Sequence, residues 1–330
     1  MKPVHWAIVG TGDIASEFAR GLKQLPGQAV RYAVVSRTHE RAQRFAEKYG
    51  FATATDDFDA VLADPKVRAV YIATPHPAHF ATARDALQAG KAVLCEKPVT
   101  LNARQFDELQ RLAVAQGAFF MEAMKTPFQP AIQRAMELVD RGDLGPIRHL
   151  EASFCFHAPR KEGSRFYEPS LGGGGLLDVG VYPLSLAYLL LGAPESTDSA
   201  LQMGPTGVDE QAALLCRYAS GASAFLRCGI YGSQEESIRI FCEDGQIELL
   251  HLRRWDPQGI RWRAYHGEWQ EEAYPTDGSP LSFEAEEVYH CLAEGLKESA
   301  VVPHRQTHAV LAQIDALRSK VGLVYPGDAE

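Results

Sequence analysis

A glycine turn between an apolar run and a helical pattern constrains this chain most strongly. Residues 5–9 are apolar over the length of a strand, Gly10-Thr11-Gly12-Asp13-Ile14-Ala15 follows, and a helical pattern continues to residue 25. In this G-x-G-x-x-A motif the first glycine permits a tight turn, the second lets backbone approach a pyrophosphate, and the alanine lets helix and strand pack closely. The helix amino end offers free N–H groups and a positive dipole. The motif predicts a dinucleotide site at Gly10, Thr11, Gly12, Asp13 and Ile14, and a purely structural glycine turn is the alternative.

Strand and helix patterns keep alternating after this turn. Further apolar strand patterns occur at residues 30–35, 51–54, 69–73, 92–95 and 118–121, with helical patterns between most of them. Strands joined by helices at this spacing form right-handed βαβ crossovers and a parallel sheet. Because 330 residues exceed the size of a single core, two domains are expected. We predict an α/β protein with an N-terminal doubly wound Rossmann domain over residues 1–124 and a second α/β domain over residues 125–330.

The second half follows a different pattern. A helix is predicted at residues 130–141 and a strand at 149–156, and the turns Ser220-Gly221 and Asp244-Gly245 separate β-rich runs between residues 211 and 252. Such turns indicate an antiparallel meander. Four glycines at 172–175 predict a mobile loop. The remaining predictions are an exposed β segment at 255–274 and helices at 176–191, 281–298 and 307–321, the last with the option of packing on the first domain.

The end of the second strand indicates which cofactor binds. This strand ends in Ser36-Arg37, about twenty residues beyond the glycines, where NAD enzymes usually carry an acidic residue for the ribose hydroxyls. Arg37, with Arg41 one helical turn later, can instead pair with a 2′-phosphate while Ser36 donates its hydroxyl. NADP(H) is therefore the preferred cofactor and NAD(H) the alternative. A solvated helix face is the alternative interpretation of the two arginines.

A later strand end is expected to border the nicotinamide. The strand at residues 69–73 is followed by Thr74, Pro75 and His76, at the edge of a parallel sheet where ligands bind. His79 lies three residues further, in the first turn of the next helix. For both histidines a structural or capping role is an equal alternative to ligand contact.

Charge, cysteines and hydropathy exclude several classes of protein. With a net charge of -9 and no concentrated basic face, the chain does not fit a nucleic-acid partner. Six cysteines lack C-x-x-C pairs and nearby histidine clusters, so we expect reduced, mostly buried thiols and no metal site. A strand pattern begins almost at once in place of a signal peptide, and the apolar run at 176–191 is short and interrupted by polar groups. A cytoplasmic protein that binds no membrane is expected.

Two positions carry candidate chemistry. Lys97, in Glu96-Lys97-Pro98, follows the strand at residues 92–95, and a lysine there points into the crevice where open α/β sheets bind ligands. A surface turn is the alternative. Asp178 and Tyr182 lie four residues apart in a predicted helix and therefore on one face. A capping aspartate plus a core tyrosine is the alternative there.

The chain resembles the Gfo/Idh/MocA oxidoreductases over essentially its whole length. The resemblance rests on the glycine motif, on Glu96-Lys97-Pro98, on Met121-Glu122-Ala123 and on residues 171–183, which include the four glycines, Asp178 and Tyr182. It implies an N-terminal Rossmann domain and a C-terminal domain with a large, open, mostly antiparallel sheet that commonly forms a dimer interface. A homodimer or a dimer of dimers is therefore expected. The resemblance also implies a cis Lys97-Pro98 bond, which is typical of the family.

Within this family, Tyr182 stands where inositol-type enzymes usually have histidine. The chain thus looks like the branch of dihydrodiol dehydrogenases, glucose-fructose oxidoreductase and aldose dehydrogenases that use NADP. Lys125 replaces the large aromatic expected in the dihydrodiol enzymes, which favours a polyol, sugar or carboxylated substrate. We expect Glu96 and Lys97 to contact cofactor as well. Substrate contacts are expected from Lys125, Arg160, Arg165 and Tyr167.

The expected reaction is hydride transfer between NADP(H) and a CH–OH group. Tyr182 would exchange the hydroxyl proton, a demanding role because the reference pKa of tyrosine is about 10. The Lys97 ammonium would stabilise the phenolate, and Asp178 would orient substrate or Lys97. Which of Lys97 and Tyr182 finally holds the proton is left open, since coupled groups titrate as a pair. A catalytically silent nucleotide and sugar sensor on the same fold is the alternative function.

Overall fold

The structure, a computed structural model, describes residues 2–161, 163–232 and 235–328. These residues form two compact units, Met1–Lys125 with Asp277–His308 and Thr126–Thr276 with Ala309–Glu330. From the sequence, all residues after 124 were expected in one second domain, but Asp277–His308 belongs to the first unit. Its helix α8 (Ser282–Glu294) lies against α1 (Asp13–Lys23), where a Cβ on Gly21 would come within 2.9 Å of the Ser282 backbone nitrogen.

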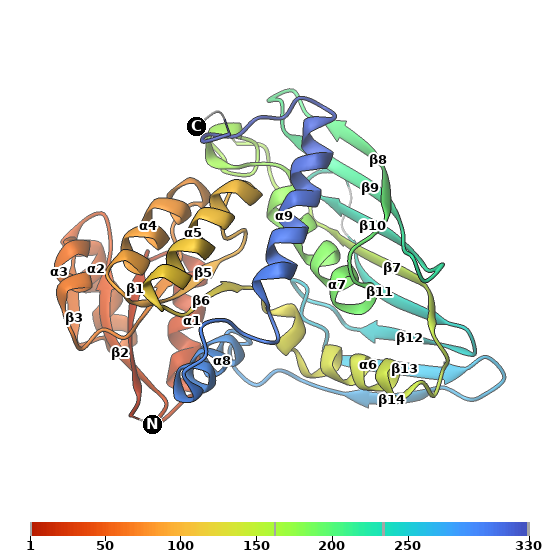
Figure 1. The fold of residues 1–330 in the computed structure, drawn as a ribbon, viewed down its shortest axis with the longest axis horizontal. Helices are drawn as coiled ribbons and strands as arrows, with labels where there is room; N and C mark the ends of the chain where they lie inside the picture. Colours follow the sequence, from red (N-terminus) through yellow and green to blue (C-terminus); the bar gives the residue numbers. More distant parts are fainter. Residues whose placement is uncertain (1, 162, 233–234, 329–330) are drawn as a thin grey trace. The chain divides into compact units, whose positions relative to one another are not determined.

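In the first unit the described strands form a six-stranded sheet in the order β3-β2-β1-β4-β5-β6 (Figure 1). Every pairing in it is parallel. The central strands β4 and β5 are buried along their whole length, as strands covered on both faces are. This sheet confirms the predicted Rossmann fold. Its strands are β1 (Val4–Val9), β2 (Ala29–Val35), β3 (Thr53–Thr55), β4 (Ala69–Ile72), β5 (Ala92–Glu96) and β6 (Phe120–Ala123).

Helices connect these strands at the predicted positions. Asn102 caps one of them by accepting a hydrogen bond from Gln105 N at 2.8 Å, and Gly117 in the left-handed conformation ends it. Besides α1 and α8, the helices of this unit are α2 (His39–Tyr49), α3 (Phe58–Ala63), α4 (His76–Gln88) and α5 (Ala103–Gln116), and α9 (His304–Ser319) begins here.

In the second unit the described strands form an eight-stranded sheet in the order β14-β13-β12-β11-β7-β10-β9-β8. β7 lies between β11 and β10, antiparallel to the first and parallel to the second, and the other pairs are antiparallel. The predicted mostly antiparallel sheet is confirmed, but a continuous meander is wrong because β7 separates β10 from β11. The strands are β7 (Ile147–Cys155), β8 (Ser196–Met203), β9 (Asp209–Arg217), β10 (Ser223–Gly229), β11 (Glu235–Cys242), β12 (Gly245–Leu250), β13 (Gly259–Ala264) and β14 (Gln270–Ala273).

Helices of the second unit lie over one face of this sheet (Figure 1). The predicted helix at 176–191 is a π-helical turn, η3, that continues into α7. The apolar segment Pro169–Leu191, 23 residues long, passes a test of length and composition for a membrane span, but 78% of its most apolar window is buried inside the protein. It is thus buried as a core helix is. The segments are η1 (Thr126–Phe128), α6 (Pro130–Arg141), η2 (Pro169–Leu171), η3 (Leu176–Gly180) and α7 (Val181–Leu191).

Two sequence predictions fail where packing overrides composition. The glycines at 172–175 are buried, and a Cβ on Gly173 would lie 2.8 Å from the Phe166 carbonyl oxygen. They serve close packing, so the predicted mobile loop is wrong. Trp255, expected in an exposed β segment, is fully buried. It follows β12 in a loop that brings the indole under α7.

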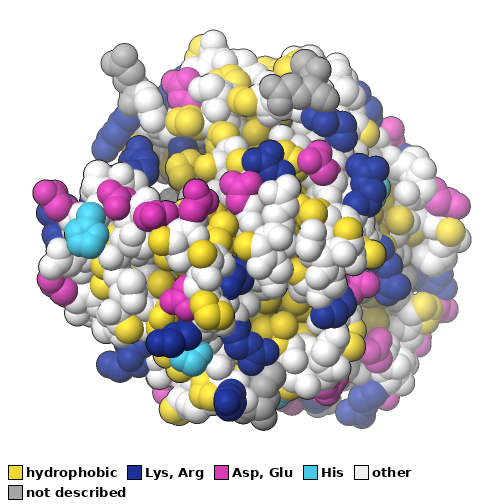
Figure 2. Space-filling view, turned by 60° about the vertical axis from the view of Figure 1, so that its left-hand side comes forward, with side chains coloured by type: hydrophobic (Ala, Val, Ile, Leu, Met, Phe, Trp, Pro, Cys, Tyr) yellow, Lys and Arg dark blue, Asp and Glu magenta, His cyan; other side chains and the backbone are white. Residues whose placement is uncertain are grey.

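The described surface mixes both signs of charge. Figure 2 shows lysine and arginine side chains interspersed with aspartates and glutamates on the face that it draws. All six cysteines are free and buried, which confirms the prediction of buried thiols for this part of the chain.

One buried carboxyl group holds the glycine turn of the second unit. Asp209 Oδ2 accepts a hydrogen bond from Leu176 N, the first residue of η3, at 2.6 Å. Burial raises the pKa of Asp209 from 3.8 to about 7. Since the folded-state pKa lies above the unfolded value, the folded protein binds more protons between these two values and loses stability as pH rises through them.

The Asp209→Asn variant cannot ionise and should lose this dependence. Between about pH 5 and about pH 8 the free energy of unfolding should fall less in the variant than in the unchanged protein, by on the order of 2 kcal/mol. Urea unfolding at both pH values measures this difference. Asp198→Asn, at an exposed ion pair with Arg217, is the control. An equal fall in Asp209→Asn and in the unchanged protein would contradict the assignment.

Candidate active site

The glycine turn of the first unit has the shape of a phosphate cradle. Gly10 has a φ of 109°, and a Cβ there would collide with the Ala73 carbonyl oxygen, so the turn passes tightly over the end of β4. Among the described residues a Cβ on Gly12 would meet nothing within 4 Å, and Gly12, the N-cap of α1, has no side chain to cap the helical N–H groups. Open space before uncapped helical N–H groups fits a pyrophosphate. Asp13 and Ile14 are exposed in the first turn of α1.

The end of β2 is tied to this turn. Thr11 Oγ1 and Ser36 Oγ are 3.2 Å apart, so the predicted hydroxyl at the end of β2 lies beside the glycine turn. Arg37 and Arg41 are exposed, and neither guanidinium has an ion pair or hydrogen bond within the described part of the chain. Two uncommitted cations that follow the end of β2 fit an additional phosphate.

The end of β4 contains both a ligand-facing candidate and a structural histidine. Thr74 Oγ1 is buried and has no hydrogen-bond partner within the described residues, while Pro75 is exposed and His76 is half-buried. His79 is fully buried, with Nδ1 2.8 Å from the Pro98 carbonyl oxygen and Nε2 2.8 Å from that of Thr74. Burial lowers the pKa of His79. Its ring therefore joins two loops, and of the two alternatives for His79 the structural one fits this geometry.

Lys97 lies at the carboxyl end of β5 in a turn built on buried carboxyl groups. The Lys97–Pro98 peptide is cis, as the family resemblance implied, and Lys97 is half-buried. Glu96 accepts hydrogen bonds from the Tyr71 hydroxyl at 2.5 Å and from Lys97 N at 3.2 Å. Burial raises the pKa of Glu96, and the neighbouring Lys97 charge opposes that shift. The Lys97 ammonium is thus matched by negative charge within its own unit.

Two further glutamates surround this turn, and the sequence analysis assigned neither a role. Glu122 accepts hydrogen bonds from Val99 N at 3.1 Å and from the Thr307 hydroxyl at 3.2 Å, and burial raises its pKa to about 7. Glu284 on α8 is 0% exposed, and neither of its oxygens has a hydrogen-bond partner within the described residues. Burial, followed by the charge of Glu96, raises the pKa of Glu284 well above its usual range.

The same cluster accounts for Lys125. This lysine is half-buried. Burial raises the pKa of Glu96 and of Glu284, and the positive charge of Lys125 opposes both rises. Lys97 and Lys125 therefore lie near one group of acids in the first unit. No spacing in the sequence brings residue 284 to residue 96, so the cluster was not predicted.

In the second unit the predicted catalytic pair lies on η3 and α7. Asp178 is 3% exposed and accepts a hydrogen bond from Arg165 Nη1 at 2.9 Å. Tyr182 is half-buried, with its ring 5.3 Å from that of Phe154. An ion pair with Arg165 thus holds Asp178, and an aromatic ring lies beside Tyr182.

Arg160 and Tyr167 make polar contacts inside the second unit. Arg160 Nη2 lies 2.5 Å from both carboxylate oxygens of Glu210, and its guanidinium stacks 4.2 Å from the Tyr231 ring centre. The buried Tyr167 hydroxyl lies 2.6 Å from the Ala158 carbonyl oxygen, to which it donates. Of the predicted substrate contacts in this unit, Arg165 bonds a predicted catalytic side chain, Asp178.

Trp255 completes the aromatic wall beside Tyr182. Its indole stacks on Phe154 with ring centres 5.4 Å apart and lies 6.1 Å from Tyr182. The Trp255 backbone has a φ of 62°, and Glu236 accepts hydrogen bonds from Trp255 N at 2.5 Å and from Arg254 N at 3.0 Å. Such a left-handed tryptophan is costly and needs this support. A sequence pattern gives no signal for it.

Comparison with known proteins agrees with this geometry. Residues 4–124 match the family model for the Gfo/Idh/MocA oxidoreductases described as an NAD-binding Rossmann fold, and residues 132–248 match the Gfo/Idh/MocA C-terminal domain. The chain is 32% identical to the trans-1,2-dihydrobenzene-1,2-diol dehydrogenase of Bos taurus over 98% of this chain and 99% of that protein. It is 33% identical to the enzyme of the same name from Mus musculus, again over 98% and 99%.

Solved structures show the same fold. A 3-ketoreductase from Actinomadura kijaniata in complex with NADP and TDP-benzene has a TM-score of 0.85 at 25% identity, covering 96% of this chain and 98% of that one. An aldose-aldose oxidoreductase from Caulobacter crescentus has a TM-score of 0.88 at 24% identity, over 97% and 98% of the two chains. With its NAD-binding Rossmann domain and its matching C-terminal domain, the chain belongs to the Gfo/Idh/MocA family of oxidoreductases.

Proposed function

We propose that this protein transfers a hydride between NADP(H) and a CH–OH group of a sugar, polyol or dihydrodiol. The observation that carries the proposal is the position of Lys97 at the carboxyl end of β5, in the same parallel sheet as the uncapped glycine turn. Ligands of such sheets bind at this edge. The names of the relatives, a dihydrodiol dehydrogenase and a 3-ketoreductase, support a hydroxyl or carbonyl carbon as the reacting centre.

The proposed proton chemistry uses two side chains. Tyr182 exchanges the proton of the substrate hydroxyl, and the ammonium of Lys97 stabilises the phenolate and polarises the substrate oxygen. Asp178, held by Arg165, orients its neighbours through its carboxylate. When bound, the nicotinamide supplies or accepts the hydride. The protein contributes position and electric field.

Removing either proton group should stop the reaction without removing the cofactor. Tyr182→Phe and Lys97→Met should each lower kcat by about 10²–10⁴-fold, the usual contribution of a positioned acid or base. An absorbance assay with NADP(H) and a panel of aldoses, polyols and dihydrodiols measures turnover, and NADPH fluorescence measures binding. Tyr188→Phe, on the same helix, is the control. Full turnover in either variant would refute the proposed proton chemistry, and NADPH binding without turnover by the unchanged protein would favour a sensor.

Selection of NADP(H) is assigned to the end of β2. We propose that Ser36, beside Thr11, and the uncommitted guanidinium of Arg37 bind a 2′-phosphate, with Arg41 adding positive charge. NADP bound in the Actinomadura kijaniata 3-ketoreductase supports this preference.

Loss of the Arg37 charge should erase the preference. In Arg37→Ala the ratio of kcat/KM for NADPH over NADH should fall at least about tenfold, because a charge-assisted hydrogen bond to phosphate is lost. Arg44→Ala, exposed on α2, the helix that follows Arg37, serves as the matched control. An unchanged ratio in Arg37→Ala would rule out the phosphate contact.

We also propose a homodimer that buries the outer face of the eight-stranded sheet. Leu215 and Phe225 are paired across β9 and β10 and are 36% and 40% exposed. Beside them, Arg239 pairs with Glu151 and Arg261 with Glu248. Paired apolar and ionic rows on one face suit a self-complementary contact. The six free cysteines support the expected reducing, cytoplasmic location.

A charge placed in this face should separate the subunits. Phe225→Asp is expected to shift the sedimentation coefficient from dimer to monomer at micromolar concentration, since an interface core tolerates no unpaired charge. Val114→Asp, at a 70% exposed valine on α5, is the control and should leave the assembly unchanged. A dimeric Phe225→Asp variant would exclude this face.

A further inference from the structure

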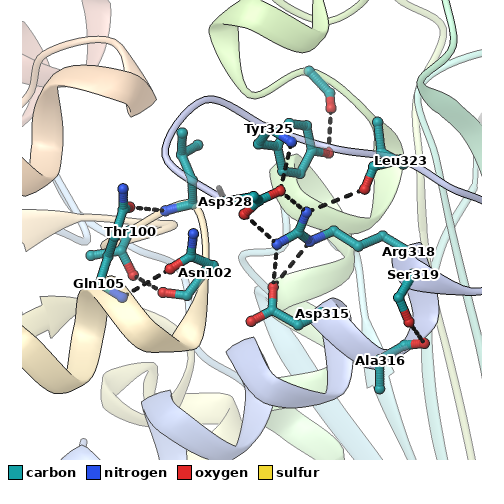
Figure 3. Close-up of polar contacts among 12 residues, drawn as sticks. Thr100, Asn102, Gln105, Asp315, Ala316, Arg318, Ser319, Leu323, Tyr325 and Asp328 are labelled. Carbon is teal, nitrogen blue, oxygen red and sulfur yellow. Dashed lines mark hydrogen bonds and ion pairs between the residues drawn. The ribbon is translucent and has the colours of Figure 1, made fainter. Parts of the chain in front are cut away.

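A clasp near the carboxyl end of the chain surrounds one arginine. We call the residues Asp315, Arg318, Leu323, Tyr325 and Asp328 the C-terminal clasp (Figure 3). Arg318 donates to Asp315 Oδ1 from Nε at 3.0 Å and from Nη2 at 2.8 Å, and from Nη2 to Asp328 Oδ1, also at 2.8 Å. Its Nη1 donates to the Leu323 carbonyl oxygen at 3.2 Å. These bonds fold the segment after α9 back onto that helix.

The clasp sets the position of one tyrosine hydroxyl. Tyr325 N donates to Asp328 Oδ2 at 2.7 Å, and the Arg318 guanidinium lies 5.0 Å from the Tyr325 ring centre. Tyr325 is 3% exposed, and its hydroxyl donates to the Gly173 carbonyl oxygen at 2.6 Å. Burial raises the pKa of Tyr325 well above its usual range, so the hydroxyl keeps the proton that it donates.

The Gly173 carbonyl group, which accepts the hydrogen bond from Tyr325, lies just before the segment that carries Asp178 and Tyr182. Gly174 N donates to the Phe166 carbonyl oxygen at 2.9 Å, and Asp178 N donates to that of Gly174 at 3.2 Å. At the far end of the turn Leu176 N is held by Asp209. Tyr325 and Asp209 thus hold the two ends of the turn that enters η3, and Asp178 and Tyr182 follow within the next few residues.

We propose that the C-terminal clasp is a positioning element for the active site, acting through the bond from Tyr325 to Gly173 on the placement of Asp178 and Tyr182. This inference rests on the proposed function of those two residues. Reacting groups must be held in near-attack geometry, and a displacement of about 1 Å can cost about a hundredfold in rate. The clasp lies outside the cofactor-binding unit, so its effect should fall on kcat and leave cofactor binding unchanged.

The test removes a single hydroxyl. Tyr325→Phe should lower kcat about tenfold while KM for NADPH stays within about twofold. By hydrogen-exchange mass spectrometry, peptides covering residues 173–182 should exchange about tenfold faster than in the unchanged protein, and peptides covering β7 should not change. Tyr218→Phe, at a buried tyrosine in the β9–β10 turn, is the matched control and should alter neither measurement. Asp328→Asn, which weakens the clasp without touching Gly173, should reproduce both effects at smaller size.

Tyr182→Phe measured in parallel separates the two proposals. If Tyr182→Phe abolishes turnover but Tyr325→Phe keeps the kcat of the unchanged protein, the clasp has no positioning role. If Tyr182→Phe retains turnover, the proposed function fails. In that case unchanged hydrogen exchange of residues 173–182 in Tyr325→Phe would overturn the positioning role of the clasp independently of turnover. A lowered kcat and faster exchange in Tyr325→Phe, with a rise in KM for NADPH no larger than about twofold, support it.

Discussion

The first unit depends on a contact that only a residue without a side chain allows. Gly10 leaves β1 against the carbonyl oxygen of Ala73, and its own N–H bonds Val35 O at 2.9 Å. This one residue therefore touches the ends of both strands that flank β1. The close approach opens space on the other side of the turn, where Gly12 precedes the uncapped end of α1. The backbone conformation at Gly10 thus affects both the shape of the glycine turn and the contact of β1 with its two neighbouring strands.

The buried carboxyl groups near Lys97 are the second feature on which the first unit depends. Glu96, Glu122 and Glu284 are buried in the same unit, and burial raises the pKa of each. Buried carboxyl groups are costly unless they are protonated or paired, and Lys97 and Lys125 supply the opposite charge. An amine held in such a field keeps a defined position.

The sequence predicted those parts of the fold that depend on residues close together in the chain. The glycine turn and the βα alternation depend on neighbouring residues, and both were found near their predicted positions. The π-helical turn at Leu176–Gly180, the buried Trp255 and the buried Glu284 depend on residues far away in the chain. The polar strand β8 lacks an apolar signal and was also not predicted. In the candidate site, residue types pointed to Lys97, Asp178 and Tyr182, but the contacts of Asp178 with Arg165 and of Tyr182 with Phe154 required tertiary structure.

The place of β7 bears on how the second unit assembles. This strand is the first of its sheet in the sequence, yet it lies between β10 and β11, which follow it by more than sixty residues. During synthesis both edges of β7 stay unpaired until those strands emerge, with apolar residues along its inner face. Pairings this distant in sequence are slow to form, and open strand edges invite contact with other chains. The middle of the sheet is therefore where the nascent protein most needs protection from aggregation.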